Sequence, residues 1–149
     1  MVRAGRAGRP AKTAFKVEYL RNEPLTPTER KFFHRLVEAV PEGVVAPQVA
    51  MSALVDIPAH MNQGKYKHVN RSQFDTQRVD YVVFDRETAE VVCVIELDDH
   101  THDSARAKEK DRRRDAMLEG VGYTVLRFDA RKMPTMGELR EHFGDGSVR

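Results

Sequence analysis

One short stretch, residues 91–102, limits what this chain can fold into more than any other. It begins with five consecutive apolar residues and continues as Glu96-Leu97-Asp98-Asp99-His100-Thr101-His102. An apolar run of this length, bounded by polar residues, predicts a buried strand. Buried carboxylates cost several kcal/mol each unless something offsets their charge. The acids at the end of this strand therefore indicate either a solvated edge or a site for a cation.

A second β-rich run, residues 78–85, precedes the first and is joined to it by a short, largely polar connection. This spacing predicts an antiparallel β-hairpin. A hairpin centred on Thr88 places Asp80 directly opposite Glu96, with Cβ atoms about 4.5–5.5 Å apart. Two carboxylates this close repel each other, but they can share one divalent metal ion. Strand alternation puts Asp98 on the face that carries Glu96.

Length and charge predict one domain with basic segments. The chain has 149 residues, of which 40% are hydrophobic and 32% charged, and its net charge is +2. We predict a flexible basic arm over residues 1–16, a single domain over 17–143 and a loose C-terminus over 144–149. The arm has five basic residues and no acid, and residues 106–114 carry six basic residues against two acids. Such segregation favours a polyanion partner, although a solvated helix face and a disordered tail would look the same.

The sequence also predicts a compartment. Cys93 is the only cysteine and lies inside the apolar run, which is typical of a core residue in a reducing cytoplasm. The basic N-terminus has no apolar stretch behind it and no apolar run reaches membrane-spanning length. Cysteine and histidine spacings typical of structural zinc are absent. We expect a cytoplasmic protein without a membrane partner.

The segment before the hairpin predicts a helix and a strand. Thr26 can cap a helix, Pro27 suits its first position and Glu29 completes a capping box. For Glu29 we favour this capping role, and the alternative is that its side chain points toward the acids of the hairpin. Residues 44–51 predict a strand, in which Pro47 indicates an edge position or an irregularity.

The remaining elements complete an α/β fold. We expect a helix from Asp103 or Ser104 to about residue 119, a strand over 123–128 and a short helix over 136–143. The connection through the long helix makes the strands on either side of it parallel. The predicted fold is therefore a mixed four-stranded sheet flanked by helices, in the order αβββαβ.

Three sets of residues resemble a known superfamily. Asp80 followed by Glu96-Leu97-Asp98, after a helix that bears Glu29, resembles the restriction-endonuclease-like PD-(D/E)xK nucleases, whose core has this order of elements. The chain also resembles an uncharacterised bacterial family within that superfamily and relatives of very-short-patch-repair endonucleases. The residues that carry this further similarity are 78–81, 95–99, Thr101, His102, Asp111, Arg114, Leu118, Gly122, Tyr123, Val125 and Arg127.

This resemblance implies a metal-dependent endonuclease that acts on nucleic acid, with DNA as the expected substrate. It implies catalytic roles for Asp80, Glu96, Asp98 and His102, with Mg²⁺ or Mn²⁺ held by Asp80, Glu96 and the carbonyl of Leu97. Glu29 is an accessory candidate. The candidates for nucleic-acid contacts are Lys65, Lys67, Lys108, Lys110 and Arg114. Sequence leaves open a homodimer or a partner protein that supplies targeting.

One residue departs from the superfamily pattern. A lysine is expected two residues after the glutamate, where this chain has Asp98. The missing cation could come from the following helix, or His102 could carry out the proton transfer, or catalysis could have been lost. Two function classes therefore stay open: a metal-dependent nuclease, and an inactive nuclease-fold module that binds nucleic acid or a partner protein. For Arg127 we expect a structural pairing with Asp98 or Asp111, whereas for Arg114 pairing and phosphate contact are both open.

Overall fold

The sheet is built around the predicted hairpin. The computed structural model describes residues 19–61, 71–72, 74–98 and 105–143. Four strands lie in the order β1-β2-β3-β4. Their bounds are β1 Gly43–Ala50, β2 Arg78–Asp85, β3 Val91–Asp98 and β4 Val125–Asp129. The first two pairs are antiparallel and β3 pairs with β4 in parallel, so the sheet is mixed as the sequence predicts.

The register of the hairpin brings the two predicted carboxylates together. Tyr81 lies opposite Ile95, and continuing this pairing by one residue places Asp80 opposite Glu96. A bulge after Val83 shifts the register nearer the turn. The predicted register is therefore confirmed at the acidic end of the hairpin, because the bulge lies between that end and the turn.

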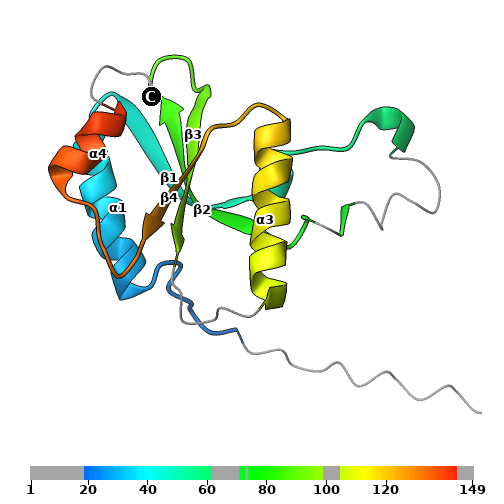
Figure 1. Ribbon diagram of the computed structural model, residues 1–149, viewed down its shortest axis with the longest axis horizontal. Coiled ribbons are helices and arrows are strands. Elements are labelled where there is room, and N and C mark those ends of the chain that lie inside the picture. Colours follow the sequence, from blue (N-terminus) through cyan, green and yellow to red (C-terminus); the bar gives the residue numbers. More distant parts are fainter. Residues whose placement is uncertain (1–18, 62–70, 73, 99–104, 144–149) are drawn as a thin grey trace, which may run out of the picture.

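Helices cover both faces of the sheet (Figure 1). Helices α1 and α4 lie on one face, and α3 crosses the other. The helices are α1 Pro27–Ala39, α3 Ala105–Gly120 and α4 Met136–Phe143, with short 3₁₀ turns at Met51–Ala53 and Ala59–Met61. The element order αβββαβ is confirmed, and the predicted bounds differ from the observed ones by two residues at most.

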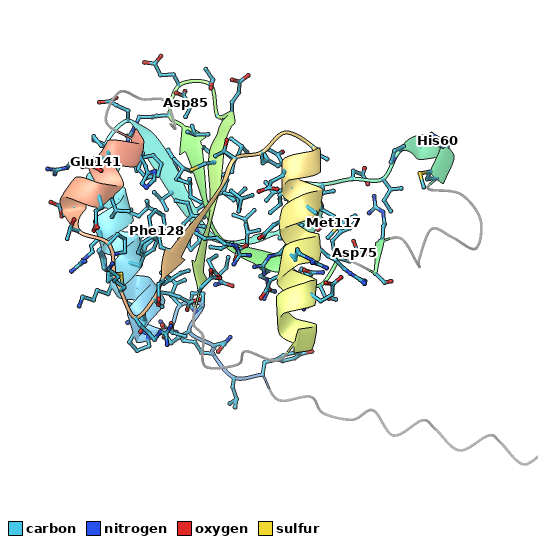
Figure 2. All side chains as sticks on the ribbon, viewed as in Figure 1. His60, Asp75, Asp85, Met117, Phe128 and Glu141 are labelled. Carbon is cyan, nitrogen blue, oxygen red and sulfur yellow. The ribbon has the colours of Figure 1, made fainter. Side chains whose placement is uncertain are left out.

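Two apolar clusters fill the space between these layers (Figure 2). The cluster under α1 and α4 contains Phe32, Tyr81 and Ile95, with Phe128 packed against it. The second cluster lies under α3. Its buried members are Met51, Phe74, Val79, Val82, Val94 and Leu118. Each face of β3 therefore supplies one cluster, which is why its apolar run is continuous.

Helix α3 contributes little to this core. Its sequence is rich in charge, and Leu118 is the one fully buried large apolar side chain on it among those that the structure describes. Met117 is only partly buried against the same cluster. Among the described side chains of α3, apolar packing is therefore confined to the C-terminal part, and Arg114 and Asp115 add ion pairs with the sheet. No helix within the described residues is long and apolar enough to cross a membrane.

Truncating Leu118 should destabilise the whole domain. We expect Leu118→Ala to lower the free energy of unfolding by about 2–5 kcal/mol, because the side chain is fully buried and its removal leaves a cavity. Urea denaturation measures the loss. Val121→Ala is the control, since Val121 is 55% exposed and should change stability by less than about 0.5 kcal/mol. Equal effects of the two substitutions would mean that α3 does not depend on this contact.

Candidate metal and phosphate site

Asp80 is fixed by the backbone of the neighbouring strand. Its Oδ2 accepts a hydrogen bond of 2.8 Å from the N–H of Leu97. The side chain is partly buried, and burial raises the pKa of Asp80 above its ordinary value, against the lowering effect of the Leu97 hydrogen bond. The nearby charge of Glu29 raises this pKa further. Asp80 therefore has one oxygen held by the strand and a local environment that favours a cation.

Glu96 is the most unusual residue of the site. Its side chain is 3% exposed, and no other charged residue in the described part of the chain is buried. Oε2 lies 2.8 Å from Nη2 of Arg114 on α3. Oε1 is buried and has no hydrogen-bond partner among the residues that the structure describes. Burial raises the pKa of Glu96 to about 8, with Arg114 opposing this shift and Asp80 adding to it.

Asp98 is engaged by a second arginine. Arg127 lies beside Glu96 in the parallel ladder and forms an ion pair with Oδ1 of Asp98. The same guanidinium donates from Nε and Nη2 to the two carboxylate oxygens of Asp115, at 2.9 and 2.8 Å. The predicted pairing of Arg127 with Asp98 is therefore confirmed. In place of the expected lysine stands a carboxylate that holds a cation from the next strand.

Arg114 has fewer contacts than Arg127. Besides Glu96, it lies 3.6 Å from Oδ1 of Asp111, one turn earlier on α3. Its side chain is 14% exposed, and its Nε is buried without a hydrogen-bond partner in the described residues. The role that the sequence left open is thus a structural one in this conformation, because the guanidinium faces the buried carboxylate.

Glu29 both caps its helix and reaches the site. Oε2 accepts a hydrogen bond of 2.6 Å from the N–H of Thr26, which confirms the capping box. Oε1 accepts one of 3.3 Å from Nε2 of Gln48 on β1. The hydroxyl of Tyr81 donates to the backbone carbonyl of Glu29 at 2.7 Å. These contacts hold the first turn of α1 against the end of the sheet where Asp80 lies.

Gln48 is a site residue that sequence reasoning missed. It interrupts the pairing of β1 with β2 between Pro47 and Val49, at the level of Asp80. Its φ of 55° lies in the left-handed region, which is uncommon for residues other than glycine. Such conformations cost free energy and collect at functional sites. The irregularity indicated by Pro47 was the only signal of it in the sequence.

The other candidate residues lie around this cluster or outside the described residues. Lys110 is exposed on α3. Lys108 belongs to α3, but its side chain is outside the described part of the structure, as are Lys65, Lys67 and His102. The structure therefore unites Asp80, Glu96, Asp98 and Arg114, adds Gln48 and Arg127, and gives no position for the predicted proton-transfer histidine.

The donor set suits a hard divalent cation with few protein ligands. Asp80 and Glu96 offer carboxylate oxygens from neighbouring strands, and Oε1 of Glu96 is buried without a described partner. Among the described residues, no group of three His, Cys, Asp or Glu side chains is arranged to hold a metal. Mg²⁺ typically uses one or two carboxylates and completes its shell with water and substrate phosphates. The residues present fit that pattern.

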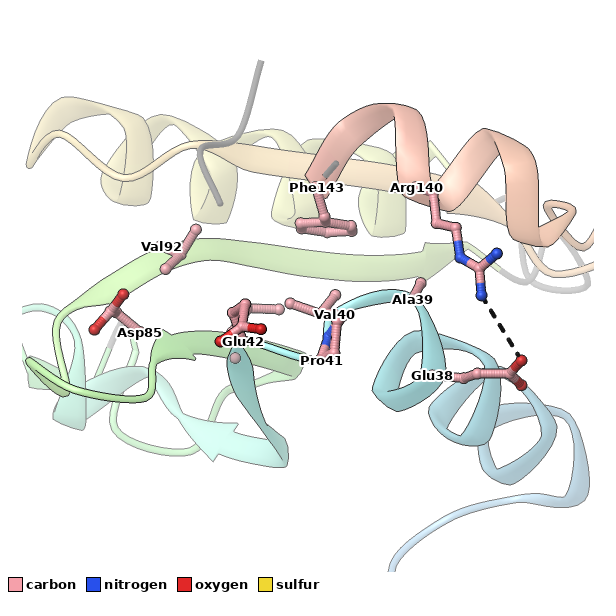
Figure 3. Close-up of a pocket in the computed structure, with 11 residues that line it drawn as sticks. Glu38, Ala39, Val40, Pro41, Glu42, Asp85, Val92, Arg140 and Phe143 are labelled. Atoms are coloured by element: carbon pink, nitrogen blue, oxygen red, sulfur yellow. Dashed lines mark ion pairs between the residues drawn. The ribbon is translucent and has the colours of Figure 1, made fainter. Parts of the chain in front are cut away.

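A separate cavity lies at the opposite end of the hairpin (Figure 3). It has a volume of about 690 Å³ and lies beside the C-terminal end of α1 and α4. Its lining includes Val40, Val92 and Phe143, with the ion pair of Glu38 and Arg140 at one side. None of the residues of the acidic site lines it. This cavity is therefore distinct from the carboxylate cluster.

The raised pKa of Glu96 predicts a pH-dependent stability difference. Between about pH 4.5 and about 8 the native state keeps a proton that the unfolded chain has released, so this group's contribution to stability falls as pH rises. Glu96→Gln keeps the shape and an acceptor for Arg114 but does not titrate. In EDTA, the variant should gain stability relative to wild type across this window and level off above it.

Urea denaturation at several pH values measures this difference. Glu87→Gln removes an exposed carboxylate from the hairpin turn and is the control for the loss of one negative charge. A difference between Glu96→Gln and wild type that stays constant with pH would show that Glu96 is ionised in the folded protein throughout the window.

The backbone of Gln48 predicts that glycine is preferred over alanine there. Gln48→Gly and Gln48→Ala both remove the contact with Glu29, but only alanine retains a Cβ in the left-handed conformation. We expect the glycine variant to be more stable by about 1 kcal/mol. Paired thermal or urea unfolding measures the difference. A more stable alanine variant would contradict the positive φ.

Comparison with known proteins gives one match. A family described as "Protein of unknown function (DUF2726)" matches residues 21–146. Neither a curated protein nor a solved structure matches the chain. The match includes every strand and helix that the structure describes, and with them the acidic cluster. The chain therefore belongs to the DUF2726 family.

Proposed function

We propose that this protein is a metal-dependent phosphodiesterase of the PD-(D/E)xK nuclease type, with nucleic acid as its substrate and DNA as the expected form. One observation carries the proposal: Asp80 and Glu96 face each other at the end of a hairpin, and Oε1 of Glu96 is buried without a described partner. Opposed carboxylates, one buried and one partly buried, destabilise a fold unless a proton or a cation joins them.

Asp80, Glu96 and the main chain at Leu97 are the proposed Mg²⁺ or Mn²⁺ ligands. When bound, such an ion polarises a phosphate and lowers the pKa of an attacking water. The chain positions its ligands before the ion arrives, because the Leu97 N–H orients the Asp80 carboxylate. Glu29 and Gln48 add a second polar layer on the side of β1.

Basic residues around the cluster are suited to hold a phosphate chain. Lys110 is exposed on α3, and Arg127 places a positive charge beside Asp98, the residue that stands where the superfamily pattern expects lysine. His102 is the proposed proton-transfer group, because its ordinary pKa near 6.5 suits that role and it follows β3 by four residues. The alternative proton carriers or cations are Lys108 and Lys110.

A second candidate function is a non-catalytic module that binds nucleic acid or a partner protein. One observation favours it: both Glu96 and Asp98 already have arginine partners, so the fold does not require a metal to offset their charge. In this case the carboxylates anchor α3, and the basic segments alone bind the polyanion.

Incubation with nucleic acid separates the two candidates. Labelled single- and double-stranded DNA and RNA are incubated with Mg²⁺, Mn²⁺ or EDTA. We expect cleavage that EDTA abolishes and that Asp80→Asn lowers by at least about 10²-fold. Asp75→Asn is the control, because Asp75 is an exposed aspartate outside the cluster.

Three results are informative in this experiment. Metal-dependent cleavage lost only in Asp80→Asn supports the nuclease. Binding without cleavage under every condition supports the second candidate. A chain that neither binds nor cleaves any of these substrates contradicts the nuclease and the nucleic-acid-binding form of the second candidate.

A further inference from the structure

Arg114 lies against Glu96, the carboxylate that is proposed to bind the metal. Its Nη2 lies 2.8 Å from Oε2 of Glu96, and the two side chains are 14% and 3% exposed. A divalent cation bound to this carboxylate would lie close to the guanidinium in a region of low dielectric, where like charges repel strongly. Arg114 and a metal ion therefore cannot both be bound to Glu96 without a large loss of affinity.

Of the two arginines in the cluster, Arg114 is the one that can leave. Arg127 donates to both oxygens of Asp115 and also pairs with Asp98. Arg114 has one close contact, with Glu96, and a longer one of 3.6 Å to Asp111. Its Nε is buried without a hydrogen-bond partner among the described residues, so the guanidinium is not fully satisfied where it lies.

A phosphate group offers Arg114 a better partner. Guanidinium binds phosphate with two parallel hydrogen bonds, and Lys110 is exposed on the preceding turn of α3. A polyanion that approaches this helix would therefore attract Arg114 away from Glu96. The carboxylate that Arg114 leaves behind is buried and needs another cation.

We propose that Arg114 is an internal counter-cation for Glu96, which competes with a divalent metal in the free protein and transfers to phosphate when a polyanion binds. Metal and polyanion binding are then positively coupled, and each strengthens the other by the same factor. This inference rests on the proposed metal site at Asp80 and Glu96. It adds that the site is closed until substrate arrives.

Metal binding to variants tests the competition directly. Mn²⁺ is titrated calorimetrically into wild type, Arg114→Met and Arg113→Met, and the Mn²⁺-induced rise in melting temperature is recorded for each. Arg113 is the matched control, since it lies on the same helix, is 74% exposed and pairs with Glu109. We expect Arg114→Met to bind Mn²⁺ at least about tenfold more tightly than wild type, with Arg113→Met unchanged.

A second measurement needs only the wild-type chain. The Mn²⁺ affinity is measured with and without a saturating short DNA duplex, at low temperature. We expect the duplex to raise it by at least about fivefold. This measurement decides the question if Arg114→Met fails to fold.

The outcomes distinguish this inference from the proposed function. Equal or weaker Mn²⁺ binding by folded Arg114→Met, or a wild-type affinity that the duplex leaves unchanged, overturns the competition while the metal site stands. If neither protein binds Mn²⁺ with or without duplex, the metal site itself is wrong and the inference falls with it.

Discussion

The burial of one carboxylate, Glu96, is the constraint on which the rest of this structure depends. The Glu96 side chain is 3% exposed, and its ion-pair partner is Arg114 on a helix that has little apolar surface. Breaking a buried pair of this kind typically costs about 3–5 kcal/mol, a large part of the stability of a small domain. The interaction that defines the candidate site therefore also helps to hold α3 on the sheet.

Arg127 extends this arrangement to the next strand. It connects Asp98 on β3 with Asp115 on α3, so two arginines, one from the helix and one from the sheet, hold the layers together. The charged residues that hold these layers together therefore also surround the proposed metal site. The cation that pairs with Asp98 of β3 thus comes from β4, its neighbour in the parallel ladder.

Sequence reasoning succeeded where the signals are local. The hairpin register followed from two β-rich runs and one short turn, and it placed Asp80 opposite Glu96 before any contact was known. The capping box of Thr26 and Glu29 could be predicted from the sequence because both residues lie within one helical turn. The parallel pairing of β3 with β4 followed from the handedness of the connection through α3. For Gln48 the only signal was the irregularity indicated by Pro47, because glutamine is not a residue type that marks a positive φ.

The sequence by itself determined the αβββαβ order, the mixed sheet and the meeting of the two carboxylates, because strand alternation and turn length act over a few residues. Only the tertiary structure decided which cations Glu96 and Asp98 face. Arg114 and Arg127 each had several acids within reach in the sequence, and the choice of Glu96 and Asp98 depends on how α3 and β4 pack. Ion pairing acts through space and depends on burial, so the chain order alone does not specify it.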